Sequence, residues 1–177
     1  VPDERFDRLV DLYQPKKIVP TKIELFDTPG LSRDEKEGNA QRLSVIREAS
    51  VLVQVIGQFA GCDPTAEASA FIDDLILADS QVVSNRVERL KKDAAKPRPD
   101  RDELQAELEA LLPIAERLEN GDELADMEFS EAQVKAASSF ALLTRKRRLV
   151  VLNTADSDID AEVVANLESA GHAVIAA

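Results

Sequence analysis

Two short runs of residues place a polar side chain directly after an apolar stretch, where chemistry could occur. In the first run, residues 23–30, the apolar stretch ends at Asp27 and Gly30 follows three residues later. A carboxylate is the hard oxygen ligand that Mg²⁺ prefers, and waters usually complete the metal's shell. Glycine lets the backbone approach a phosphate because no Cβ intervenes. The order of strand, acid and tight turn therefore predicts a magnesium and phosphate site, the simpler alternative being an ordinary strand-to-loop turn.

The second run places Asn153 directly after the apolar residues 149–152, and Asp156 follows three residues later. The side-chain amide of an asparagine both donates and accepts hydrogen bonds, so it can bind the edge of a nucleobase. Open α/β sheets bind ligands at the carboxyl ends of their strands, so we expect Asp27 and Asn153 at the same edge of one sheet. Taken alone, however, the second run is better explained as a turn and a helix N-cap.

The composition limits the class of protein. The 177 residues suffice for one domain, or for one domain with an insertion. The net charge of -12 argues against a nucleic-acid binder that uses its whole surface, and no DNA partner is expected. Cys62 is the single cysteine, which excludes an internal disulfide and a cysteine-based zinc cluster. No apolar run approaches the ~20 residues that span a bilayer, so we expect a cytoplasmic protein without membrane contact.

Apolar periodicity predicts alternating strands and helices on both sides of a long helical segment. Strands are expected over residues 18–26, 50–56, 148–152 and 173–176, and helices over residues 3–13, 34–48, 130–143 and 161–170. The run at 50–56 is almost continuously apolar, which is typical of a strand covered on both faces in a parallel sheet. We therefore predict an α/β fold with a mostly parallel sheet.

Residues 66–140 are predicted to form a helical insert that projects from this sheet. A first helix over residues 66–95 must end at the two prolines of residues 96–99. A second helix has a seam of apolar residues spaced four, three, four and three apart, and Gly121 is suited to end it. The two helices are expected to form an antiparallel coiled-coil hairpin. The seam consists of Leu104, Leu108, Leu111, Ala115 and Leu118.

Charge is unevenly distributed over this hairpin. Residues 86–101 include seven basic and three acidic side chains, whereas residues 102–131 include eleven acidic side chains and one basic one. The simpler interpretation, which we favour, is that the two helices attract each other. The alternative is a docking patch for RNA or a ribosome. Its contacts would be Arg86, Arg89, Lys91, Lys92, Lys96, Arg98 and Arg101.

The chain resembles the Obg-like ATPases, the YchF family of translation-factor P-loop NTPases, from Val1 to about Ala177. The resemblance implies that residues 1–65 and 141–177 form a partial nucleotide-binding (G) domain of the P-loop NTPase type, with residues 66–140 as its coiled-coil insert. The most specific stretch is LILAD at the head of the hairpin. Besides the Asp27 run, the similar stretches are residues 1–5 (VPDER), 46–48 (IRE), 63–64 (DP), 75–79 (LILAD), 86–90 (RVERL) and 142–144 (LLT).

The resemblance also implies roles for single residues. Asp27 corresponds to the acid that holds magnesium through a water, and Gly30 to an amide donor to the γ-phosphate. Asn153 corresponds to the base-binding asparagine, and Ala176 lies where the last base-contacting segment would be. Asp156 stands where the family more often has glutamate, which leaves the choice between ATP and GTP open.

The resemblance names no certain catalytic residue. Leu31 occupies the position at which many GTPases have the glutamine that orients water, and a leucine cannot do so. The family usually has a histidine in the loop after the second strand, but the only histidine here is His172, for which we expect a solvated position. The segment after Gly30 is also shorter and poorer in glycine than the family pattern.

The phosphate-binding pattern G-x-x-x-x-G-K-[ST] is absent from the 177 residues. Because the chain starts at Val1, we expect this loop upstream in a longer protein, and we expect the C-terminal domain of the family to be missing as well. The leading hypothesis is the central part of a switch protein that binds and hydrolyses ATP or GTP with Mg²⁺ and associates with the ribosome. It is an enzyme only if the upstream loop is present. The alternative is a non-hydrolysing interaction module that binds its partner through Arg86, Arg89, Lys92 and Arg98.

Overall fold

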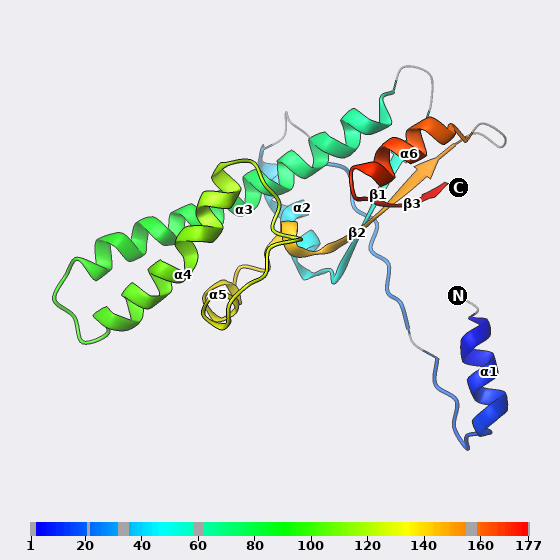
Figure 1. Ribbon diagram of the computed structural model, residues 1–177, viewed down its shortest axis with the longest axis horizontal. Coiled ribbons are helices and arrows are strands. Elements are labelled where there is room, and N and C mark those ends of the chain that lie inside the picture. The colour runs from blue at the N-terminus through cyan, green and yellow to red at the C-terminus, as the bar shows by residue number, and fades with distance from the viewer. Residues whose placement is uncertain (1–2, 21, 32–35, 59–61, 155–158, 177) are drawn as a thin grey trace.

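The structure is a computed structural model that describes residues 3–20, 22–31, 36–58, 62–154 and 159–176 (Figure 1). A small sheet lies at one end of the molecule and a long helical hairpin extends away from it (Figure 1). In chain order the elements are α1 (Glu4–Tyr13), α2 (Lys36–Glu48), β1 (Val51–Gly57), α3 (Pro64–Ala94), α4 (Arg101–Glu119), α5 (Glu131–Ala137), the 3-10 helix η1 (Leu143–Arg145), β2 (Arg147–Asn153), α6 (Ala161–Ser169) and β3 (Ala173–Ala176).

The three strands of the described residues form one sheet in the order β1-β2-β3, and both neighbouring pairs are parallel. In the register, Gly57 lies opposite Asn153, and Leu152 lies opposite Ala176. All three strands therefore end at the same edge of the sheet. The predicted α/β fold with a parallel sheet is confirmed.

One face of the sheet is covered by helices. Ile56 and Leu152 pack with Ala68 of α3 and Leu167 of α6 in an apolar cluster. The opposite face of β1 exposes Val51, Val53 and Val55, which retain 49–66% of their accessible surface. The expectation that this strand is covered on both faces is therefore wrong for the described residues, because only one of its faces meets a packing layer.

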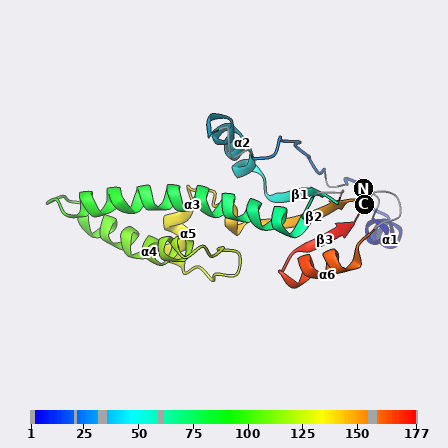
Figure 2. The same cartoon turned by 90° about the horizontal axis from the view of Figure 1, so that it is seen from above.

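The helical hairpin has its own core. Helices α3 and α4 lie side by side in both views, joined by the turn that contains the two prolines (Figures 1 and 2). Gly121 follows α4 with a φ of +82°, the left-handed conformation that only glycine adopts readily, as the sequence predicts. The predicted seam lies inward: Leu108, Leu111, Ala115 and Leu118 are buried, and Leu104 is packed against them.

The predicted strand over residues 18–26 does not form. These residues adopt no regular structure where they are described, and Leu25 and Phe26 are 82% and 75% exposed. A strand needs a neighbour that accepts and donates its backbone hydrogen bonds, and no strand of the described sheet pairs with this segment. The apolar pattern of these residues predicted a strand but could not show whether a pairing partner exists.

Helix α5 begins as predicted but ends earlier. A reciprocal capping box between Ser130 and Gln133 starts the helix, which stops at Ala137 rather than near residue 143. The chain then turns through Ala141, whose φ is +47°, and enters η1. Among the described residues, no helix is both long and apolar enough to cross a membrane.

Replacing Leu111 by alanine tests whether the hairpin core stabilises the protein. Leu111 has no exposed surface, so Leu111→Ala should lower the free energy of unfolding by about 2–5 kcal/mol through lost burial and a cavity. Its neighbour Leu112 is 40% exposed, and Leu112→Ala should cost much less. Urea unfolding followed by circular dichroism measures both variants, and equal losses would contradict the predicted packing.

Candidate functional site

The carboxyl edge of the sheet brings two of the predicted nucleotide contacts together. Asn153 is the last residue of β2 and is exposed, while its backbone carbonyl accepts a hydrogen bond of 2.9 Å from the amide of Gln58. Ala176 ends β3 and pairs with the residue just before Asn153. The parallel topology therefore places Asn153 and Ala176 at one edge, whereas Asp156 lies outside the described residues.

The predicted metal ligand lies on an irregular segment rather than at a strand end. Asp27 is exposed and makes no hydrogen bond or ion pair with another described residue. A methyl group added at Gly30 would meet nothing within 4 Å, so the packing of the described residues does not require glycine there. An unpaired carboxylate close to an unobstructed backbone fits a hydrated cation and a phosphate. The predicted proximity of Asp27 and Asn153 stays a prediction.

A magnesium ion would find one protein ligand here and not a cage. Among the residues that the structure describes, no group of three or more histidine, cysteine, aspartate or glutamate side chains could hold a metal ion. Mg²⁺ commonly retains several waters and binds through only one or two carboxylates. The environment of Asp27 is compatible with that mode of binding.

Leu31 is held by packing. It is half buried and lies against a small core cluster that joins α2, β1, α3 and η1 through Ile46, Leu52, Leu75 and Leu143. The side chain thus serves the core, and it has no polar atom that could orient a water. The exposed segment of Asp27 is thereby anchored at its C-terminal end to the base of the hairpin.

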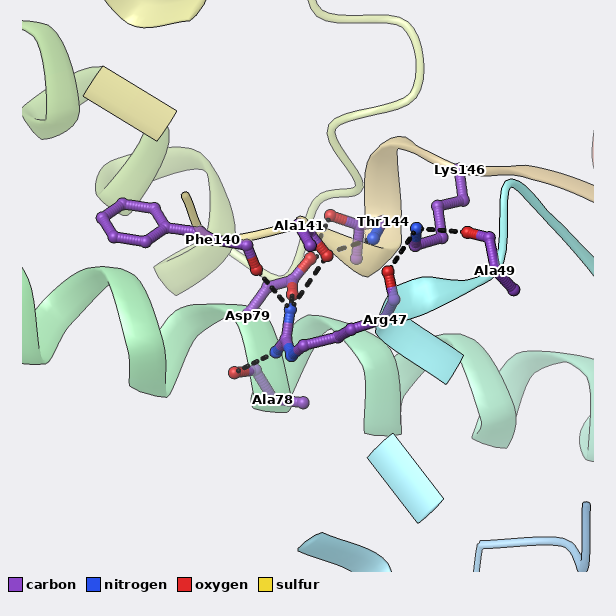
Figure 3. Close-up of polar contacts among 8 residues, drawn as sticks. All are labelled: Arg47, Ala49, Ala78, Asp79, Phe140, Ala141, Thr144 and Lys146. Atoms are coloured by element: carbon purple, nitrogen blue, oxygen red, sulfur yellow. Dashed lines mark hydrogen bonds and ion pairs between the residues drawn. The ribbon is translucent and has the colours of Figure 1, made fainter. Parts of the chain in front are cut away.

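A buried polar network, which was not predicted from the sequence, lies beside this cluster (Figure 3). Asp79 of α3 has no exposed surface. Its Oδ1 accepts a hydrogen bond of 2.9 Å from Nη1 of Arg47, and its Oδ2 accepts bonds of 2.9 Å from both the backbone amide and the hydroxyl of Thr144. Three segments that are far apart in sequence therefore meet at one carboxylate.

Arg47 makes further contacts around this carboxylate. Its Nη1 also donates to the carbonyls of Phe140 and Ala141 at 3.0 and 3.1 Å, and its Nη2 donates to the carbonyl of Ala78 at 3.3 Å (Figure 3). A planar guanidinium with a rigid fork of donors suits such multiple contacts, whereas a lysine ammonium does not. The left-handed turn at Ala141 belongs to the loop that presents these carbonyls.

Lys146 closes the end of α2. Its Nζ donates to the carbonyls of Arg47 and Ala49, at 2.9 Å and 2.5 Å, where the helix ends. A cation at a helix C-terminus is favourable because the exposed carbonyls carry partial negative charge. Burial lowers the pKa of Lys146, as does the nearby charge of Arg47, whereas Asp79 raises it.

The four residues predicted to bind a partner, Arg86, Arg89, Lys92 and Arg98, differ in whether they have acidic partners. Arg86 forms a bidentate ion pair with Glu107 of α4, at 2.7 and 2.6 Å, and this carboxylate raises the pKa of Arg86. Arg98 hydrogen-bonds to Asp100. The favoured interpretation, in which the two helices of the hairpin attract each other, therefore applies to Arg86. Arg89 and Lys92, by contrast, are exposed and have no ion-pair partner among the described residues.

His172 is half buried rather than fully solvated as expected. Burial lowers its pKa, and so does Arg148, whereas Glu123 raises it. It lies in the turn before β3. His172 is not one of the predicted nucleotide contacts.

Comparison with known proteins decides the family. Over 171 residues the chain is 31% identical to the ribosome-binding ATPase YchF of Bacillus subtilis, covering 90% of this chain and 46% of the relative. It is 30% identical to Obg-like ATPase 1 of Oryza sativa subsp. indica, covering 89% of this chain and 43% of the relative. The structure of the Schizosaccharomyces pombe YchF GTPase matches 99% of this chain and 53% of its own, with a TM-score of 0.79 and 25% identity.

The chain belongs to the YchF and Obg-like ATPase family. The family recognised from the sequence is thereby confirmed, although a scan of general protein-family models finds no match. The chain spans about half the length of these curated YchF-type relatives.

Three of the stretches that carry the resemblance to the YchF family contain the residues of the buried network. Arg47 lies in residues 46–48, Asp79 ends residues 75–79, and Thr144 ends residues 142–144. The signal for the network was therefore present in the sequence as three separate stretches. Nothing in any single stretch indicated that they meet.

Replacing Asp79 by asparagine tests how much this network contributes to the stability of the protein. The variant leaves the guanidinium of Arg47, which is 19% exposed, without its counter-charge, so Asp79→Asn should lower the free energy of unfolding by about 3–5 kcal/mol. Asp73 is on the same helix and exposed, and Asp73→Asn should change stability by less than about 0.5 kcal/mol. Urea titration compares the two variants. A loss at Asp79 no larger than that at Asp73 would show that the pair is energetically unimportant.

Proposed function

We propose that the chain is part of a nucleotide-dependent switch protein that binds ATP or GTP with Mg²⁺ and hydrolyses it. The observation that carries the proposal is the position of Asn153. It is exposed at the carboxyl edge of a parallel sheet, beside the end of β3, in a fold shared with a YchF GTPase. Ligands of open α/β sheets bind at this edge.

The proposed roles follow the chemistry of each side chain. The amide of Asn153 binds the base, with Ala176 beside it at the same edge and Asp156 completing the contact. The amide of Gly30 donates to the terminal phosphate. Asp27 holds magnesium through a water, and the bound metal would neutralise charge on the phosphates. Leu31 packs against the core, so another group must orient the attacking water.

The choice of base stays open. Two of the relatives are named ATPases and the solved structure is named a GTPase. Hydrolysis is proposed for the complete protein, because the phosphate-binding loop pattern does not occur in these 177 residues. We assign residues 1–65 and 141–177 to the nucleotide-binding part and residues 66–140 to the insert. Because the Bacillus relative is named ribosome-binding, we propose a ribosomal partner and a cytoplasmic location.

A second candidate is a module that binds its partner through the hairpin without hydrolysis. The observation that favours it is the exposure of Arg89 and Lys92 without acidic partners among the described residues. Unpaired cations on one helix can attract the phosphates of RNA. The ion pairs of Arg86 and Arg98 make those two residues poorer contacts than Arg89 and Lys92.

Nucleotide binding by the complete protein, expressed from its whole gene, tests the first candidate. Titration calorimetry with ATP and with GTP should show binding that requires Mg²⁺. Asn153→Ala should weaken this binding by about tenfold or more through lost hydrogen bonds to the base. Asn166→Ala, at an exposed position on α6, is the matched control and should bind normally. Absence of magnesium-dependent binding in the unchanged protein would refute the switch function.

Charge reversal tests the second candidate. The double variant Arg89→Glu, Lys92→Glu should abolish co-sedimentation with ribosomes at physiological salt, because two attractive charges become repulsive. Lys16→Glu, Lys17→Glu changes the net charge equally on the exposed segment after α1 and should co-sediment normally. Unaltered ribosome binding by the hairpin variant would exclude the tip of the hairpin as the contact.

A further inference from the structure

We infer that Arg47 and Asp79 are a positioning pair that transmits changes at residues 27–31 to the helical hairpin, with α2 as the rigid connection between them. The inference rests on the proposed function, since residues 27–31 contain the predicted contacts to magnesium and phosphate. It assigns a role to a buried network that no step of the proposed nucleotide chemistry uses.

One end of the connection is at Gly30. Nη1 of Arg42, on α2, donates a hydrogen bond of 3.1 Å to the carbonyl of Gly30. The next residue, Leu31, packs against the cluster that contains Ile46 of the same helix. The backbone that would bind the phosphate is therefore attached to α2 by one polar and one apolar contact, through which its displacement would pull on α2.

The other end of the connection is at Asp79. Arg47 lies five residues after Arg42, a rise of about 7.5 Å along the helix, and its guanidinium contacts Asp79, Ala78 and the loop of residues 140–141. Lys146 holds the last carbonyls of the same helix. Helix α2 thus joins the segment of Gly30 to the middle of α3 without a flexible joint between the two arginines.

Burial makes this connection cooperative. Asp79 has no exposed surface, and a buried carboxylate that loses its counter-ion is strongly unfavourable. Helices α2 and α3 therefore cannot separate at this point by small independent shifts. Tightly packed contacts of this kind tend to exchange between discrete arrangements, which is how small displacements at a ligand become larger ones elsewhere.

The network connects to the two regions in which a response to nucleotide is expected, the tip of the hairpin and the base-binding edge of the sheet. Beyond Asp79, α3 continues for 13 residues to Lys92, about 20 Å of helix, so a small rotation at the joint moves the exposed cations at the tip. In the other direction, Thr144 lies in η1, immediately before β2, whose far end is Asn153. The base side and the phosphate side of the predicted site therefore both connect to this pair.

The test is hydrogen exchange on the complete protein, with and without a non-hydrolysable ATP or GTP analogue and Mg²⁺. In the unchanged protein, the analogue should alter exchange in α2, in residues 140–146 and in the hairpin by about threefold or more. In Arg47→Lys, which keeps the charge but loses the fork, the response should remain near residues 27–31 and disappear from the hairpin, while the affinity for the analogue changes less than threefold.

The matched control is Arg117→Lys. Like Arg47, Arg117 forms an ion pair, but its partner Asp126 lies within the insert, with Nη2 of Arg117 at 2.6 Å from Oδ1 of Asp126. This variant should retain the hairpin response. Thr144→Val provides a second variant if Arg47→Lys fails to fold. It removes the hydroxyl bond to Asp79 but leaves the Arg47 contact in place, and it should weaken the response.

The outcomes separate the two proposals. If the unchanged protein does not bind the analogue, the proposed function and this inference both fail. If the analogue binds and the hairpin does not respond, or if the hairpin of Arg47→Lys responds as in the unchanged protein, the inference alone is overturned. Loss of the response in Arg47→Lys but not in Arg117→Lys supports it.

Discussion

The structure depends on a carboxylate that has no access to water. Removing Asp79 from solvent is costly unless an opposite charge and further hydrogen bonds replace the lost hydration. Arg47 supplies the charge and Thr144 supplies two donors. Because these partners come from α2 and from the approach to β2, the chain must bring three remote segments together before the carboxylate is satisfied. The base of the hairpin is thereby fixed relative to the sheet.

Features that arise within a few residues were predictable from the sequence. The capping serine of α5 and the glycine that ends α4 each act within one helical turn, and the apolar seam of the hairpin repeats every three or four residues; the structure has all three where expected. Strand formation is different, because a strand requires a partner. Residues 18–26 have suitable apolar residues, but no described strand pairs with them. For the same reason, the apolar run of β1 did not reveal that one of its faces lies open.

The candidate site likewise contains features that were predictable from the sequence and features that were not. Asn153 and Ala176, to which the resemblance assigns base contacts, lie at one edge because β2 and β3 pair in parallel register. The position of Asp27 depends on a strand that does not form, so topology could not place it. The buried network escaped detection because Arg47 and Asp79 are 32 residues apart, and Asp79 and Thr144 are 65 apart. Each residue alone is typical of an ordinary polar position on a helix or turn.

Helix α3 combines three environments that usually belong to separate elements. Near its start, Ala68 packs under the sheet; Asp79 lies in the buried network; and Lys92, near its end, is exposed. The 31 residues form one continuous helix of about 46 Å. A helix without a break transmits rotation along its length, so the position of the distal cations is set by contacts at the sheet and at Asp79. Under the proposed coupling, a ligand that shifts those contacts would also shift the charged tip.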